Sequence, residues 1–310
     1  MKVINHYTKT KGKISYNPLI RSFVFFFSRA ITLFIKIQRR EFSKPKIRKV
    51  FIETISFCNN NCTFCPASKK AGNKNPGHKM TIETFEKIVN QLHEMHFSGT
   101  LALYCNNEPL IDPRIPAFVK RLREEFSSSK IEIITNGFWL NAELATVLFE
   151  AGLSTLTINH YDNSLQLSNR LKKFTREFSD KRYQNKVCIY LRLKDEVLSN
   201  RSGDADNAKT IDKSLPLWCS LPFEQLYLNY AGDVILCCSD VLWKVTLGNI
   251  NEKSIKEIWF NNRFCEIRKS LLEGRRDTIE TCKRCDFLGI RHNPEGFFST
   301  IAMVIGLSNH

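Results

Sequence analysis

The segment Phe57-Cys58-Asn59-Asn60-Asn61-Cys62-Thr63-Phe64-Cys65-Pro66 decides how the rest of the chain is interpreted. Its three cysteines lie four and three residues apart, so their thiolates can converge on one soft-metal object. A closed tetrahedral site needs a fourth ligand, and three thiolates therefore leave one coordination position open. On a four-iron cluster, whose irons are otherwise all held by cysteines, that position would accept a ligand from outside the protein.

The spacing of this cysteine triad also allows two alternatives. The cysteines could belong to the core, or they could bind zinc with His78 or Cys105 as the fourth ligand. The chain holds 11 cysteines in 310 residues, an odd number in a chain too long for a disulfide-stapled domain. No convincing secretory signal precedes them. We therefore expect a cytoplasmic protein that uses thiolates as ligands.

Short apolar runs alternate with amphipathic segments from Lys49 onwards, which is typical of βα repeats around a parallel sheet. The predicted strands are Val50 to Phe57, Thr100 to Tyr104, Lys130 to Thr135, Thr155 to Asn159 and Val187 to Leu193. The predicted helices between them are Thr81 to Met95, Ile115 to Phe126, Ala142 to Ala151 and Leu165 to Phe178. This pattern predicts an α/β fold with a closed or partial barrel, although five strands are fewer than the eight of a closed one.

A smaller domain is expected after the barrel. A polar stretch, 199–213, leads to a predicted β-hairpin whose strands are Gln225 to Tyr230 and Val234 to Cys238. One long helix, Ser254 to Leu272, is predicted after the hairpin, and Cys265 on it is expected to be a buried thiol. The expected organisation is a basic N-terminal segment (1–48), a core domain (49–213) and a C-terminal domain (214–310).

The positive charge is concentrated at the N-terminus. Lysine and arginine outnumber aspartate and glutamate by 46 to 31, a net charge of +15, which would normally indicate a polyanionic partner. Residues 1–48 hold 12 bases and one acid, whereas the other 262 residues hold 34 bases and 30 acids, so we expect no specific nucleic-acid partner. Arg21, Arg29 and Lys36 interrupt the apolar stretch Leu19 to Ile37, which favours an interfacial helix on an anionic membrane surface over a spanning helix. The alternative is a helix packed on the outside of the catalytic domain.

These motifs together resemble those of the radical S-adenosylmethionine (radical SAM) family. The family signature is CxxxCxxC with an aromatic residue before the last cysteine, which is Phe64 in this chain. The resemblance implies a partial (β/α)6-type TIM barrel and a [4Fe–4S] cluster on Cys58, Cys62 and Cys65. It also implies that SAM binds the open iron of that cluster, with Phe64 beside it.

The segment Tyr104 to Leu110 is similar to the family's Gly-Gly-Glu-Pro motif, which contacts the SAM amino group. Asn106 and Asn107 replace the two glycines, so only Glu108 carries over from that motif.

Two asparagines extend the resemblance. Asn136 follows the third predicted strand and Asn159 ends the fourth, at the places where the family contacts the ribose. Arg192, on the fifth predicted strand, is a further candidate for binding the SAM carboxylate or a substrate. The SAM-binding segments follow the carboxyl ends of their strands, which form the rim where barrel active sites are assembled.

A second group of cysteines lies in the C-terminal part and comprises Cys219, Cys237, Cys282 and Cys285. Two pairs from distant segments describe either a second iron–sulfur cluster or a zinc ribbon. The opening of the group, with Gly232 at the hairpin turn, resembles the SPASM or twitch extension of radical SAM proteins. No cysteine follows Cys285, so the resemblance implies one auxiliary [4Fe–4S] cluster, as in the twitch form of an aminocyclitol dehydrogenase. Cys238 competes with Cys237 as a ligand.

The resemblance implies reductive cleavage of SAM to a 5′-deoxyadenosyl radical, with a flavodoxin or ferredoxin as electron donor. No side chain is assigned as catalytic. Because an auxiliary cluster can take an electron from a substrate radical, we expect an oxidoreductase that dehydrogenates a small polyol, aminocyclitol or sugar-type metabolite. The second hypothesis is a peptide maturase that forms thioether or carbon–carbon crosslinks, and the third is a non-catalytic zinc-binding module.

Overall fold

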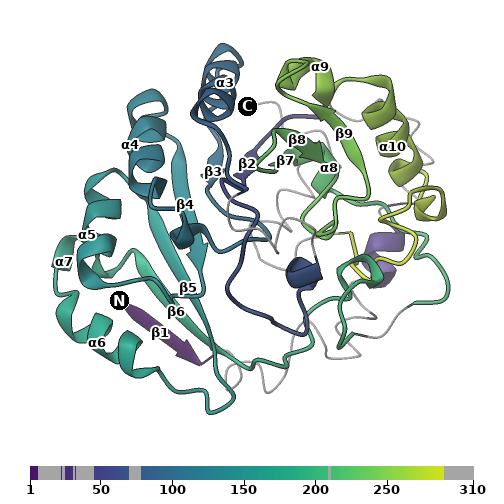
Figure 1. Ribbon diagram of the computed structural model, residues 1–310. Helices are drawn as coiled ribbons and strands as arrows, with labels where there is room; N and C mark the ends of the chain where they lie inside the picture. Colours follow the sequence, from purple (N-terminus) through teal and green to yellow (C-terminus); the bar gives the residue numbers. More distant parts are fainter. Residues whose placement is uncertain are drawn as a thin grey trace.

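The computed structural model describes residues 1–5, 22, 25–30, 32, 45–69, 78–208 and 211–289 (Figure 1). The strands are β1 (Lys2–Asn5), β2 (Lys49–Ile52), β3 (Thr100–Ala102), β4 (Lys130–Thr135), β5 (Thr155–Tyr161), β6 (Val187–Arg192), β7 (Gln225–Leu228), β8 (Asp233–Ile235) and β9 (Thr246–Asn249). The α-helices are α3 (Ile82–Glu94), α4 (Ile115–Glu125), α5 (Ala142–Glu150), α6 (Asn169–Glu177), α7 (Lys181–Gln184), α8 (Leu221–Glu224), α9 (Ile255–Trp259) and α10 (Asn262–Leu272). Short 3-10 helices are η1 (Pro66–Lys69), η3 (Pro109–Ile111), η4 (Arg201–Gly203) and η5 (Arg276–Thr278).

All described strands join one sheet in the order β1-β6-β5-β4-β3-β2-β7-β8-β9. The pairings from β1 to β7 are parallel, and β8 and β9 continue antiparallel. Helices α3 to α6 cover the outer side of the curved parallel part (Figure 1). The predicted α/β fold with a partial barrel is confirmed, and parallel pairing places the strands' carboxyl ends at one rim.

The helices form where apolar residues recur at helical spacing behind a capping residue. In α3, Phe85, Ile88, Val89 and Leu92 are buried, and the Thr81 side chain accepts a hydrogen bond from the backbone N–H of Thr84 at the helix start. α4 and α5 also bury apolar faces. The Asn141 side chain caps α5, whereas α4 has no side-chain cap and begins with a proline in its first turn. This packing fixes the strand ends that carry the rim segments.

The first predicted strand is longer than the strand in the structure. β2 ends at Ile52, because the chain then leaves the ladder and pairs with residues 78–80. Thr54 O accepts from the backbone N–H of Met80 at 2.8 Å, and Ile55 forms an isolated bridge with Lys79. Residues 53–57 therefore run as an extended segment into the cysteine loop.

β1 was not among the predicted strands. It comes from the basic N-terminal segment and pairs in parallel with β6, with Val3 opposite Ile189. A four-residue strand is too short to show a pattern in the sequence. Its pairing covers an edge of the parallel sheet that would otherwise expose unpaired backbone groups.

The predicted single helix from Ser254 to Leu272 is two helices, α9 and α10, separated by Asn261. The Asn261 side chain accepts from the Phe264 backbone N–H at 2.7 Å and donates to Leu247 O at 2.8 Å. It therefore acts as the N-cap of a new helix instead of continuing the old one. Cys265 on α10 is exposed, so the expectation of a buried thiol is wrong.

Most of residues 1–48 lie outside the described residues, including much of the apolar stretch Leu19 to Ile37. Within that stretch, residues 25–30 are helical, and Ser28 and Thr32 are buried. The Trp218 backbone N–H donates to Thr32 Oγ1 at 3.2 Å, so this part packs against the C-terminal half of the chain. Among the described residues, no helix is long and apolar enough to cross a bilayer.

The predicted domain boundaries at residues 49 and 214 stay predictions.

Candidate active site

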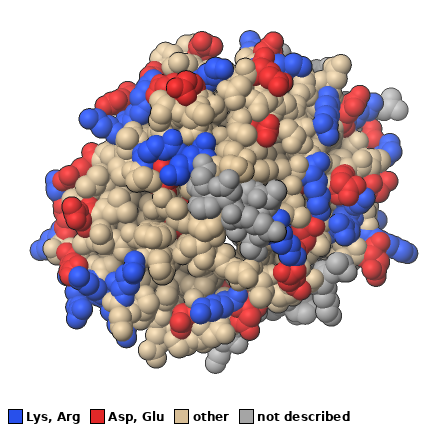
Figure 2. Space-filling view, viewed as in Figure 1, with Lys and Arg blue, Asp and Glu red and all other residues tan. Residues whose placement is uncertain are grey.

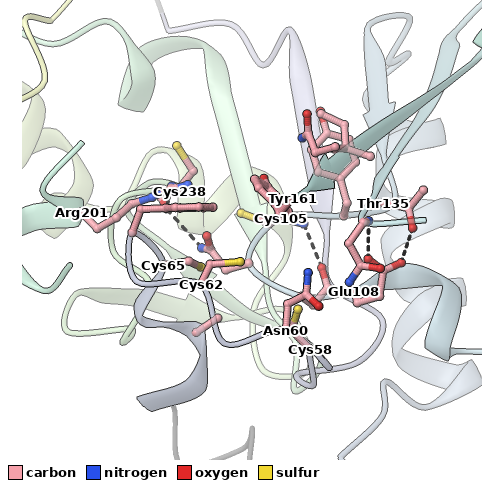
Figure 3. A pocket seen from close by; sticks show the side chains of 18 of the residues that line it. Cys58, Asn60, Cys62, Cys65, Cys105, Glu108, Thr135, Tyr161, Arg201 and Cys238 are labelled. Carbon is pink, nitrogen blue, oxygen red and sulfur yellow. Dashed lines mark hydrogen bonds between the residues drawn. The ribbon is translucent and has the colours of Figure 1, made fainter. Parts of the chain in front are cut away.

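A cavity of about 300 Å³ opens at the carboxyl rim of the sheet (Figure 3). Its wall is formed by the cysteine loop after β2, the segment after β3 and the ends of β4 and β5. Arg201 and Cys238, from further along the chain, complete the wall. This volume lies at the lower end of the range for small-molecule sites.

The structure brings the cysteine triad together at this cavity, where Cys58, Cys62 and Cys65 all line the wall. The Cys65 backbone N–H donates to Cys62 O at 3.0 Å, which closes a tight turn between the second and third thiols. Burial raises the pKa of Cys58 to about 12 and that of Cys62 to about 11. A backbone hydrogen bond from Asn60 partly opposes the rise at Cys58. Cys58 and Cys62 are therefore protonated at neutral pH until a metal displaces their protons, and three soft thiolates fit an iron–sulfur cluster.

Glu108 connects the cysteine loop to β4. Its backbone N–H donates to Phe57 O at 3.0 Å, directly before the first cysteine. One carboxylate oxygen accepts from the Leu110 N–H at 3.2 Å and from the Thr135 hydroxyl, and the other accepts from the Asn136 N–H at 2.7 Å. Burial raises the pKa of this carboxyl, and these donors oppose the rise. Glu108 lines the cavity, and each carboxylate oxygen can accept more than one donor.

Phe64, Asn136 and Asn159 line the same cavity, so the structure groups them with the triad. The Asn136 amide nitrogen donates to Asn59 Oδ1 at 2.9 Å, which ties the end of β4 to the cysteine loop. The Phe64 ring lies 5.1 Å from the Tyr161 ring, centroid to centroid. Contact of these residues with SAM stays a prediction.

Arg192 is not among the described residues that line the cavity. Its Nε donates to Glu196 Oε2 at 2.9 Å at the end of β6, and both side chains are largely buried. Arg201 is the guanidinium at the cavity instead, where it donates to Cys238 O at 3.3 Å. Its Nε is buried and has no hydrogen-bond partner among the described residues. Arg201 lies in the polar stretch 199–213, where no motif marks it in the sequence.

The backbone at Arg201 is strained. Arg201 has φ 46°, Ser202 has φ 62° and Gly203 has φ 88°. A left-handed conformation costs a non-glycine residue roughly 1–2 kcal/mol, so neighbouring contacts must hold it. Asn200 provides two such contacts, because its side chain donates to Arg284 O at 2.6 Å and accepts from the Asp286 N–H at 3.2 Å.

The four C-terminal cysteines also come together, beside Arg284 and Asp286. Cys219, Cys237, Cys282 and Cys285 are each 8% exposed. Burial is the largest cause that raises the pKa values of the Cys237 and Cys282 thiols. The charges of neighbouring cysteines are the next largest cause. No three ligating side chains in the described part of the chain lie close enough to share a single metal ion. A four-iron cluster is larger than one ion, and four buried thiols fit it by their chemistry.

Cys237 and Cys238 both lie close to the other C-terminal cysteines. The charges of Cys238, Cys282 and Cys285 act on the Cys237 thiol, and the charge of Cys238 acts on the Cys219 and Cys285 thiols. Cys238 lines the cavity beside Arg201, and its carbonyl also accepts from the Asn106 side chain at 3.2 Å (Figure 3). Cys237 does not line the cavity, whereas Cys238 does, so Cys237 stays our predicted auxiliary ligand and Cys238 is a thiol of the cavity wall.

Arg276 holds the auxiliary segments together and was not found from the sequence. It is 1% exposed, and its guanidinium donates to Leu217 O at 2.7 Å, Trp218 O at 2.6 Å and Phe287 O at 2.6 Å. These carbonyls belong to the two segments that carry Cys219 and Cys285. Its charge opposes the burial that raises the pKa of Cys219 to about 11. Arg276 thus joins the two segments that carry Cys219 and Cys285, and its positive charge stabilises buried thiolates.

A partial barrel with three thiols at its rim and four more in a second buried site defines an iron–sulfur enzyme. The pattern of the radical SAM superfamily matches residues 52–183, and that of SPASM, an iron-sulfur cluster-binding domain, matches residues 219–286. The chain belongs to the radical SAM superfamily and carries a SPASM-type domain after its barrel. Its cofactors are a [4Fe–4S] cluster, an auxiliary cluster and SAM.

The chain is similar to the S-adenosyl-L-methionine-dependent 2-deoxy-scyllo-inosamine dehydrogenase of Niallia circulans. The identity is 28% over 245 residues, which cover 77% of this chain and 93% of the relative. The crystal structure of BtrN in complex with AdoMet and 2-DOIA superposes with a TM-score of 0.69 at 27% identity, covering 79% of this chain and 95% of that one. BtrN in an open conformation shares the fold with a TM-score of 0.57 at 24% identity, covering 78% and 92%.

Replacing Cys237 and Cys238 separately should distinguish the two positions. Cys237→Ala is expected to lower the iron content after anaerobic reconstitution from about eight to about four per chain, because one four-iron cluster is lost. Cys238→Ala should keep about eight irons. Iron and sulfide analysis of both variants tests this, and loss of a cluster from Cys238→Ala alone would reverse the assignment.

Arg276→Lys should damage the auxiliary site, because one ammonium group cannot bond three carbonyls in the planar arrangement of a guanidinium. We expect the free energy of unfolding to fall by about 2 kcal/mol or more and the auxiliary iron to be lost. Arg268→Lys is the matched control, since Arg268 is also buried and bonds the Pro222 and Trp259 carbonyls. It should destabilise the protein while keeping both clusters. Equal iron retention in the two variants would contradict the role given to Arg276.

Proposed function

We propose that the protein is a radical SAM dehydrogenase that oxidises a hydroxyl group of an aminocyclitol or a similar small polyhydroxylated metabolite. The observation that carries this proposal is the position of Arg201. Its guanidinium lies in the cavity of the cysteine triad, and the auxiliary segment holds it there through Asn200. The similarity to a 2-deoxy-scyllo-inosamine dehydrogenase over most of both chains supports the same reaction class.

In this proposal, one group of cavity residues holds the cluster and another binds SAM. Cys58, Cys62 and Cys65 would hold the cluster. The buried carboxylate of Glu108 would accept a hydrogen bond from the amino group of SAM. Asn136 and Asn159 would meet the ribose. When bound, the SAM-ligating cluster supplies a radical that takes hydrogen from carbon, and the auxiliary cluster supplies an acceptor for the remaining electron.

Polar groups of the cavity support a hydroxylated substrate. Arg201 Nε and the Asn107 amide nitrogen are buried there without hydrogen-bond partners among the described residues. A buried donor left unpaired costs about 1–3 kcal/mol, so ligand oxygens at these positions would be favoured. The pocket walls, including Phe51, Phe64 and Tyr104, would exclude water from the reacting carbon.

The similarity over most of both chains is to a dehydrogenase of a small aminocyclitol. A peptide maturase is therefore the weaker alternative. We no longer favour a non-catalytic zinc-binding module, because the chain matches the radical SAM and SPASM families.

A flavodoxin or ferredoxin would supply the electron for SAM cleavage. We also propose a cytoplasmic location, where such donors occur. A peripheral contact of residues 1–48 with anionic membrane is proposed from their charge, with 12 bases against one acid.

The proposal is tested by incubating oxygen-free protein with SAM, dithionite and a panel that contains 2-deoxy-scyllo-inosamine, related aminocyclitols and simple polyols. We expect one substrate to give a product two hydrogens lighter, with 5′-deoxyadenosine in equal amount, by mass spectrometry. SAM cleavage with a crosslinked product from a peptide panel instead would establish the maturase alternative.

Arg201→Gln serves as the substrate-site variant in the same assay. It should lower kcat/KM for the substrate at least tenfold, equivalent to about 1.4 kcal/mol, because it removes a charged donor. Slow 5′-deoxyadenosine release without substrate should stay within about twofold of the wild type, since the variant keeps the cluster ligands. Loss of both activities together would place Arg201 at SAM instead of at the substrate.

A further inference from the structure

A basic face lies on α6 and α7. Residues 165–186 hold seven lysines and arginines against two acids, a net +5, whereas residues 49–310 as a whole carry only +4. Arg170, Lys172, Lys173 and Arg176 are all exposed on α6. Figure 2 shows lysine and arginine side chains gathered over α6, at the lower left of the view. The positive excess of the folded body is thus concentrated on one face.

An exposed aromatic pair borders this basic face. Phe138 and Trp139, in the loop after β4, are each 49% exposed and lie edge to face with centroids 5.3 Å apart. The Arg170 guanidinium lies 4.6 Å from the Phe138 ring centroid and also donates to the Phe138 carbonyl. The groove between α5 and α6 contains Trp139 and Arg170, and also Glu143 and Glu177. The aromatic pair is therefore continuous with the charged helix.

The aromatic pair is connected to the cysteine loop by one side chain. Asn136 Oδ1 accepts from the Phe138 backbone N–H at 2.8 Å, and Asn136 Nδ2 donates to Asn59 Oδ1 at 2.9 Å. Asn59 is the residue after Cys58. Phe138 is two residues from Asn136, so their Cα atoms are at most about 7.6 Å apart. A protein bound at this face would approach the triad from the side of Cys58.

We propose that the Phe138–Trp139 pair and the basic face of α6 form the docking site of an acidic one-electron donor protein of the flavodoxin type. This inference rests on the proposed function, which requires an electron from outside the chain. In the step, the flavin hydroquinone is oxidised by one electron and the triad-bound cluster is reduced by one. Redox partners dock through small, charged interfaces, and opposite charge raises their rate of encounter.

The position of the face favours this partner over an anionic membrane or a nucleic acid. A membrane or nucleic acid gains nothing from a location beside the cluster loop, whereas an electron donor must approach the cluster. An exposed aromatic pair beside a charged surface also matches the composition of protein interfaces.

The test compares two charge reversals of equal size. Lys172→Glu with Arg176→Glu reverses the α6 face, and Lys253→Glu with Lys256→Glu is the control at exposed residues near α9. The probe is a bacterial flavodoxin, first in its oxidised form, whose binding to reconstituted protein is followed by flavin fluorescence at low salt. The α6 variant should bind about tenfold more weakly than the wild type, and the control should bind within about twofold.

The same proteins are then reduced either by flavodoxin with its NADPH-dependent reductase or by dithionite. The α6 variant should lose about tenfold in flavodoxin-dependent 5′-deoxyadenosine formation and keep the dithionite-dependent rate. The docking site would be overturned if both charge reversals lost the same flavodoxin-dependent activity. It would also be overturned if the α6 variant bound anionic vesicles more weakly while its flavodoxin binding stayed unchanged. If the α6 variant loses the dithionite rate, the neutral pair Lys172→Gln with Arg176→Gln is used, and unchanged flavodoxin affinity there would also overturn it. Absence of dithionite-dependent cleavage in the wild type would instead refute the proposed function.

Discussion

One buried carboxylate, that of Glu108, holds the functional rim together. Its backbone bonds the residue before the first cysteine, and its side chain bonds the end of β4 through Thr135 and Asn136. Glu108 is 2% exposed, so its hydrogen bonds must offset the cost of its burial. The cysteine loop has little regular structure of its own and depends on this connection for its position. A second bond, from Asn136 to Asn59, fixes the same loop from the side of β4.

Hydrogen bonds through Asn200 connect the two iron–sulfur sites. The segment of Cys282 and Cys285 holds Asn200, and Asn200 holds the strained turn at Arg201. The cavity and the four-cysteine site are therefore adjacent, with Cys238 in the cavity wall next to Cys237 in the chain. Strained backbone persists only where its surroundings determine it, which is common at functional sites. Damage to the auxiliary site is expected to reach the substrate through this turn.

Residues in local motifs could be predicted from the sequence to lie together. The triad, Glu108 and Asn136 follow parallel strands and Asn159 lies near the end of β5, and parallel pairing brings these parts of the chain to one cavity. The barrel itself followed from regular βα alternation. The domain boundaries stay predictions, although β1 and β7 join the barrel strands in one sheet.

Residues that act through tertiary contacts were missed. Arg201 reaches the cavity because distant backbone groups hold its turn, and Arg276 bonds carbonyls about sixty and ten residues away in the chain. Arg192 was a candidate on the fifth predicted strand, and the sequence does not show that Glu196 pairs with its guanidinium. The start of α10 was missed because Asn261 caps it through a tertiary bond to Leu247.

We expect the cysteine triad to bind a cluster with one iron open to SAM. Electron paramagnetic resonance tests this on the reduced Cys237→Ala protein, which should hold only the triad cluster, before and after addition of SAM carrying nitrogen-15 in its amino group. SAM should change the cluster signal and introduce hyperfine coupling to the labelled nitrogen. A cluster signal that SAM leaves unchanged would contradict it.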